Sequence, residues 1–118
     1  MIEIKCVDEQ RALSVCERLR VPCGDVFEMT DRGQVIAAAV AVRQEETVSL
    51  AFLEAPDASL TDALLRAVLN AAQTKGAQTA QIEPLALREY AVKRKYLTNT
   101  DEKTLNIADF FAKSVCKG

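Results

Sequence analysis

A strand, a helix and a second strand follow one another in the middle of this sequence, and that order limits the folds open to the chain. Residues 47–53 have the spacing of a half-buried strand. A stripe of apolar side chains at helical spacing begins near Ser59 and ends before Gly76, a residue type that commonly stops a helix. Residues 77–83 again have the pattern of a strand. Because this order makes a right-handed crossover, we expect strands 47–53 and 77–83 to be parallel neighbours.

The residues before this unit predict a short strand at positions 2–6, a helix and two further strands. Asp8 can cap the helix, which stops near Arg20. Residues 35–42 are an unbroken apolar run whose alanines would also suit a helix, but the turn residues around it favour a strand covered on both faces. This run and the strands on either side of it are predicted to form an antiparallel meander. In its last strand, the side chains expected to share a face are Val48, Leu50 and Phe52.

The start of the central helix carries two residues with capping chemistry. Ser59 and Asp62 are three positions apart, as in a capping box, although Glu or Gln is the usual second partner. We expect Ser59 to cap the helix and Asp62 to complement its dipole, which would contribute about 1 kcal/mol to stability.

The last third of the chain predicts a helix over residues 87–96, a strand over 104–107 and a short closing helix over 109–117. A length of 118 residues corresponds to one domain, residues 1–118. The predicted fold is α/β: a mixed central sheet in which an antiparallel meander precedes a parallel β-α-β crossover, with helices on both faces.

Composition narrows the class of partner. A net charge of −2 gives no general attraction to nucleic acid or to an anionic membrane. The basic run at residues 93–95 is either a solvated helix face or a small anion-facing patch, too short for a nucleic-acid footprint. Since no stretch has the length of a membrane span or a signal peptide, we expect a cytoplasmic protein.

Cysteine and histidine usage argues against a metal site. The sequence has no His, and its four cysteines form no C-x-x-C pair. We expect reduced thiols, most of them packed as small apolar residues. Whether Cys6 meets Cys116 is left open, because their pairing requires the two ends of the chain to come together. Cys23 lies in a loop after Pro22, but a Cys-His pair is excluded.

The order of elements, together with residues 64–77, resembles the GCN5-related N-acetyltransferase (GNAT) superfamily. Residues 64–77 are similar to the family's central helix, which runs through a terminal Lys-Gly into the next strand. The likeness covers residues 1–97. It implies that strands 47–53 and 77–83 splay apart to receive the pantetheine arm of acetyl-CoA, and that the reaction is acyl transfer to an amine, with no metal.

The resemblance is weakest in the loop before the central helix. The family's Arg/Gln-x-x-Gly-x-Gly/Ala signature holds a pyrophosphate on backbone amides at a helix N-terminus. Here Pro56, Ser59 and Thr61 occupy the three signature positions, and Asp57 and Asp62 add negative charge. Either the helix is capped by its own side chains, or the loop still binds CoA through main-chain amides.

The resemblance also implies candidate site residues. A Tyr in the helix after the fifth strand often serves as general acid, and Tyr90 is the candidate, with Tyr96 nearby, although neither has the usual Tyr-x-x-x-Gly-Phe context. Glu54 is the first candidate for the base and Glu28 the second, because no His is present. Acetyl-CoA would be held by Phe52, Leu53, Ser59, Leu60 and Thr61.

A different class of function is a non-catalytic module. It would keep the scaffold and use its cleft or an open sheet edge for a protein partner, including a second copy in a homodimer. A third possibility, an unrelated α+β domain, requires that the meander and the crossover lie in separate sheets.

Overall fold

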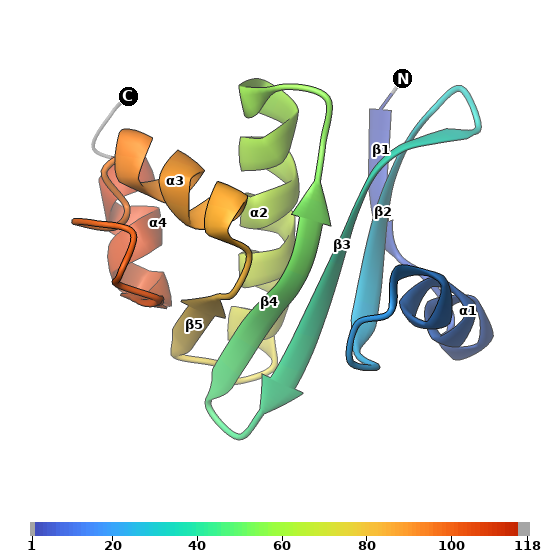
Figure 1. Ribbon diagram of the computed structural model, residues 1–118, viewed down its shortest axis with the longest axis horizontal. Helices are drawn as coiled ribbons and strands as arrows, with labels where there is room; N and C mark the ends of the chain where they lie inside the picture. Colours follow the sequence, from blue (N-terminus) through green and yellow to red (C-terminus); the bar gives the residue numbers. More distant parts are fainter. Residues whose placement is uncertain (1, 116–118) are drawn as a thin grey trace.

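A computed structural model describes residues 2–115, with side chains up to Ala112, and shows one mixed sheet with helices on both faces (Figure 1). In chain order the elements are β1 (Ile2–Cys6), α1 (Glu9–Leu19), β2 (Asp25–Asp31), β3 (Gln34–Gln44), β4 (Thr47–Glu54), α2 (Ala58–Thr74), β5 (Thr79–Ile82), α3 (Leu85–Lys93), β6 (Thr104–Asn106) and α4 (Ile107–Val115). The strands lie in the sheet in the order in which they occur in the chain.

The strand pairing confirms the predicted topology. β1 to β4 pair antiparallel, β4 and β5 pair parallel from Thr47↔Thr79 to Leu50↔Ile82, and β5 and β6 pair antiparallel. Because the meander and the crossover share this sheet, the alternative of an unrelated α+β domain is excluded.

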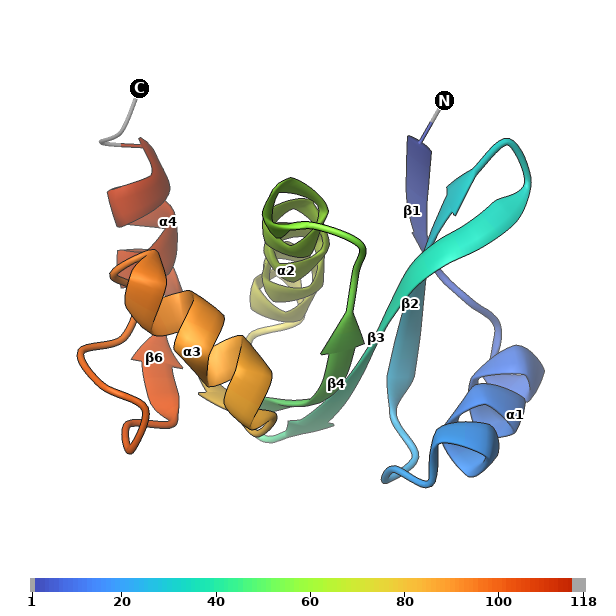
Figure 2. The ribbon, with the colours of Figure 1, turned by 45° about the horizontal axis from the view of Figure 1, so that its top comes forward.

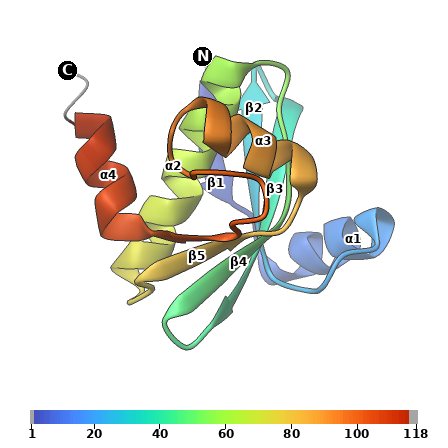
Figure 3. The same ribbon diagram turned by 60° about the vertical axis from the view of Figure 1, so that its left-hand side comes forward.

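Helix α1 covers one face of the sheet. As the sequence predicted, the Asp8 carboxylate caps the helix, accepting a hydrogen bond from the Arg11 amide, and the helix stops at Arg20, which adopts the left-handed conformation. The buried side of α1 and the sheet residues beneath it form a small cluster: Ala12, Val15, Cys16, Val26 and Val40. Figure 3 shows α1 on one side of the sheet and α2 on the other.

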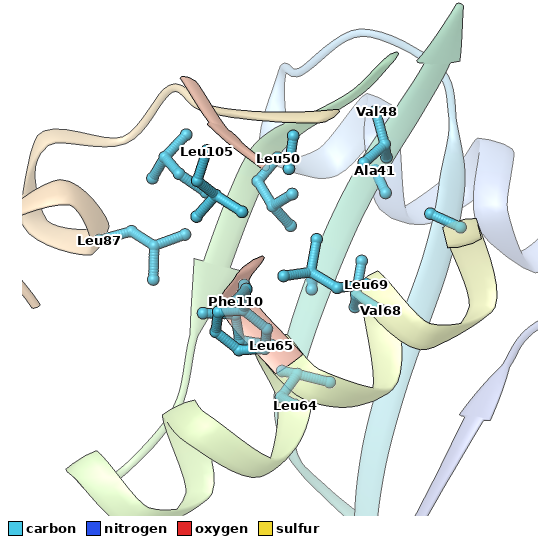
Figure 4. Packing of buried hydrophobic residues seen from close by; sticks show 14 of the residues in the cluster. Ala41, Val48, Leu50, Leu64, Leu65, Val68, Leu69, Leu87, Leu105 and Phe110 are labelled. Carbon is cyan, nitrogen blue, oxygen red and sulfur yellow. The ribbon is translucent and has the colours of Figure 1, made fainter. Parts of the chain in front are cut away.

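Helix α2 covers the opposite face and forms the main core with it. Leu64, Leu65, Val68 and Leu69 are fully or almost fully buried. Figure 4 shows the α2 leucines turned toward Ala41, Val48 and Leu50 of the sheet. Val40 packs toward α1 while its neighbours Ala39 and Ala41 pack toward α2, so β3 is covered on both faces, as predicted.

The boundaries in the last third differ from the prediction. Helix α3 ends at Lys93 because Lys95 adopts a positive φ of 65°, so Tyr96 lies beyond the helix. Helix α4 begins at Ile107, because the Asn106 side chain accepts the Asp109 amide at 2.9 Å and caps it; Ile107 therefore belongs to the helix, not to a strand. The predicted end of this helix at Lys117 lies outside the described residues.

The cysteines do not pack as expected. Cys16 is buried, but Cys6 and Cys23 are exposed, and all three are free thiols. Cys116 lies outside the described residues. Within residues 2–115, no three Cys, Asp or Glu side chains gather as a metal-binding group. The described helices include none long and apolar enough to span a membrane.

Candidate functional site

The two parallel strands separate at their carboxyl ends. β5 pairs only with the first half of β4, and the last main-chain contact is the Glu83 amide donating to the Leu50 carbonyl at 3.2 Å. Beyond Leu50, residues 52–54 pair with β3 on one side and with no described strand on the other. The sheet therefore opens next to the start of α2 and the side of α3 (Figures 1 and 2).

A β-bulge accompanies this opening. Val40 pairs with Phe52 and Ala41 with Leu50, so Ala51 is an extra residue in β4. A bulge shifts the alternation of side chains between the two faces. Phe52 accordingly packs toward α1, whereas Leu53 packs toward the α2 core. The prediction that Phe52 shares a face with Val48 and Leu50 is therefore wrong.

A shallow hollow lies in the opening, with a volume of about 340 Å³, which is at the small end for a ligand pocket. Its lining is largely apolar, with one carboxylate, one aliphatic hydroxyl and one phenol. The lining residues are Leu53, Glu54, Ala55, Ala58, Thr61, Ala86, Leu87 and Tyr90.

The structure brings four of the seven candidate site residues together in this hollow: Leu53, Glu54, Thr61 and Tyr90. The other three do not line it. Phe52 lies on the α1 face, Ser59 is exposed, and Leu60 packs against the main core. Glu28, the second candidate base, is also on the α1 face, where it accepts a hydrogen bond from Arg11 at 2.8 Å.

Asp57, not Ser59, caps helix α2. Its carboxylate accepts the Leu60 amide at 2.8 Å, and its carbonyl accepts the Thr61 hydroxyl at 2.8 Å. Asp and Ser are about equally good caps, so the local sequence offered two starts and the helix took the earlier one. Among the described residues, the amides of Ala58 and Ser59 have no hydrogen-bond acceptor.

Asp62 does not lie in the first turn of α2, where it was expected to complement the helix dipole. It is 8% exposed, and its Oδ1 accepts hydrogen bonds from the hydroxyls of Tyr90 at 2.7 Å and Tyr96 at 2.9 Å. Its Oδ2 accepts from Arg66 Nε at 2.6 Å, and Arg94 lies 3.6 Å from Oδ1. Asp62, which was expected to complement the helix dipole, is instead the centre of a cluster of polar side chains. Arg94, from the basic run at residues 93–95, belongs to this cluster.

The pKa values in the cluster follow from these contacts. Burial by itself would raise the pKa of Asp62, but hydrogen bonds from Arg66, Tyr90 and Tyr96 outweigh it and hold the pKa below its usual value. Burial and the bond to Asp62 raise the pKa of Tyr90 well above its usual value. Since a general acid works best with a pKa near the working pH, this geometry favours a positioning role for Tyr90.

Glu54 supplies the carboxylate in the lining of the hollow. It is exposed at the end of β4, and its carboxylate makes no hydrogen bond or ion pair with any described residue. Its position at the end of β4 places a carboxylate at the edge of the hollow.

Known structures share this architecture. The ribosomal-protein-S18-alanine N-acetyltransferase from Escherichia coli matches with a TM-score of 0.63 and 14% identity over 91% of this chain and 94% of that chain. A GNAT family acetyltransferase from Elizabethkingia anophelis, solved with acetyl-CoA bound, matches with a TM-score of 0.59 and 15% identity over 80% and 74%. The chain has a GNAT-like fold.

A further match to this GNAT-like chain is the IAA acetyltransferase from Bacillus cereus, with a TM-score of 0.59 and 13% identity over 80% of this chain and 75% of that chain. No protein-family model and no curated protein matches the sequence. The resemblance predicted from the sequence is confirmed for the fold. The sequence did not reveal the bulge at Ala51 or the Asp62 cluster, because each depends on residues from separate elements.

Proposed function

We propose that this GNAT-like protein binds an acyl-CoA in the hollow and transfers the acyl group to an amine. The observation that carries the proposal is the separation of β4 from β5 after Leu50. It leaves one side of residues 51–54 without a strand, so the amide groups of a pantetheine arm can pair with this main chain as an added strand would.

In the proposed reaction the amine nitrogen attacks the thioester carbonyl carbon, a C–N bond forms and the C–S bond breaks. Glu54 accepts the proton that the amine loses. The thiolate of CoA leaves and takes a proton from solvent at the open side of the hollow. Tyr90, held by Asp62, forms one wall and positions the thioester.

The helix start predicts weak binding of the CoA diphosphate. The amides of Ala58 and Ser59 are available to it, but Asp57 occupies the Leu60 amide and brings a negative charge to the same helix end. A helix N-terminus attracts anions through its free amides, and a capping carboxylate competes with them.

Two other contacts favour a second candidate, a non-catalytic GNAT-like module. A self-capped helix and a tyrosine engaged with Asp62 are both compatible with a scaffold that carries out no acyl transfer. This module would use the hollow for a protein segment instead of a cofactor.

Melting curves with millimolar acetyl-CoA and CoA test the first proposal. A ligand at 100 times its dissociation constant stabilises the folded state by about 2.7 kcal/mol. A rise in Tm together with acetylation of an amine supports the enzyme. A rise in Tm without transfer supports a binding module, and no rise at millimolar ligand rejects the acyl-CoA proposal.

A further inference from the structure

The outer edge of β1 carries main-chain groups without a described partner. Among the described strands, β1 lies at one end of the sheet and pairs with β2 alone. The Val7 amide donates to the Val26 carbonyl at 2.9 Å, so Val7 faces β2. Because successive residues of a strand face opposite sides, the amides and carbonyls of Ile2, Ile4 and Cys6 point to the open edge.

This edge is accessible. Ile2 is 45% exposed, and Glu3, Lys5 and Cys6 are exposed as well. Helix α1 packs over the neighbouring strand β2. An exposed edge of this kind is a template for another strand, and charged side chains on it decide which strands are accepted.

The charges on β1 select one self-pairing register. If two copies pair antiparallel about Ile4, Glu3 of each lies opposite Lys5 of the other, and the edge-facing main chains of Ile2, Ile4 and Cys6 meet one another. A shift about Glu3 or Lys5 would place like charges directly opposite. Opposite charges across strands stabilise pairing and like charges weaken it.

We propose that this chain forms a symmetric dimer in which two β1 strands pair antiparallel about Ile4, joining both sheets into one. Such a dimer is isologous: the same surface of each copy contacts the other. Glu3 and Lys5 both favour this register and disfavour pairing with unrelated strands. The inference is independent of acyl-CoA binding, because the hollow lies at β4.

Charge exchange tests the dimer. Sedimentation over a range of concentrations gives the dissociation constant of the wild type and of Glu3→Lys and Lys5→Glu. Each single variant creates like-charge pairs at both symmetry-related positions and should weaken the dimer about tenfold. The double variant, and an equimolar mixture of the two single variants, should restore it. Glu17→Lys, an exposed site on α1, makes the same charge change away from β1 and should have no effect.

Hydrogen exchange checks the register independently of mutation. In the dimer the Ile4 and Cys6 amides should exchange more slowly as protein concentration rises, while the Lys5 amide, which faces β2, should not change. Circular dichroism of each variant verifies that it is folded. A chain that stays monomeric at about 1 mM, or a dimer that Glu3→Lys does not weaken, overturns the proposal.

Discussion

The hydroxyl of Tyr90 donates a hydrogen bond to Asp62 Oδ1 across 2.7 Å, and this contact joins α3 to α2 at the wall of the hollow. Tyr96, which follows α3, and Arg66 of α2 bind the same carboxylate, so one side chain joins α2 to α3 and to the segment after α3. The shape of the hollow therefore depends on Asp62.

Replacing Asp62 by Asn should destabilise the fold by about 2–3 kcal/mol, since hydrogen bonds to a charged group are lost and buried donors are left poorly satisfied. Urea denaturation measures the change. Glu89→Gln, the same neutralisation on the exposed side of α3, should have almost no effect. Equal effects of the two variants would contradict the assigned role of Asp62.

The contribution of Asp62 to the stability of the fold should depend on pH. Its folded-state pKa is lowered, so the unfolded state binds a proton first as the pH falls. The stabilisation is complete above the ordinary Asp pKa of about 3.9 and disappears as the pH drops through the folded-state value. The stability difference between wild type and Asp62→Asn should therefore shrink below about pH 4. A stability difference that grows as the pH falls would contradict a lowered folded-state pKa for Asp62.

Asp57→Asn should strengthen CoA binding. Asn is an equally good helix cap, so the variant removes the charge beside the proposed diphosphate position and keeps the helix start. We expect a several-fold lower dissociation constant, measured by titration calorimetry. Asp8→Asn makes the same change at the cap of α1 and should leave binding unchanged. If Asp57→Asn and Asp8→Asn lower the dissociation constant equally, the effect comes from the net charge of the chain and not from the position of Asp57.

Glu54→Gln should lower any acetyl transfer by about 100-fold or more, because a general base contributes about that much to the rate. Binding of acetyl-CoA should change little, so the loss should appear in kcat. Glu45→Gln, in the exposed turn between β3 and β4, is the matched control. Full activity in Glu54→Gln would exclude Glu54 as the base.

Gly24→Ala should destabilise the fold by about 1–3 kcal/mol through overpacking. A Cβ at this position would lie 2.5 Å from the Ala41 carbonyl oxygen in β3. Gly33→Ala tests backbone strain alone, because Gly33 has a φ of 82° and open space around it; it should cost about 1 kcal/mol. Thermal unfolding of both variants compares the two effects.

The sequence by itself determined the elements and their order. Apolar spacing located α1, α2 and the meander, and the strand–helix–strand order predicted that β4 and β5 are parallel. These features are local or follow from general rules of chain connection. The Asp8 cap was predictable for the same reason, since a single residue near the helix start had the required chemistry.

Only the tertiary structure decided how the site is made. Asp57 and Ser59 were near-equivalent caps by residue type, and only the structure shows that Asp57 takes this position. The bulge that separates Phe52 from Leu50 is a property of the pairing between β3 and β4. Asp62 meets Tyr90 and Tyr96 across 28 and 34 residues of sequence. Periodicity reports which side of an element is apolar, but contacts at such separations exist only once the elements have packed.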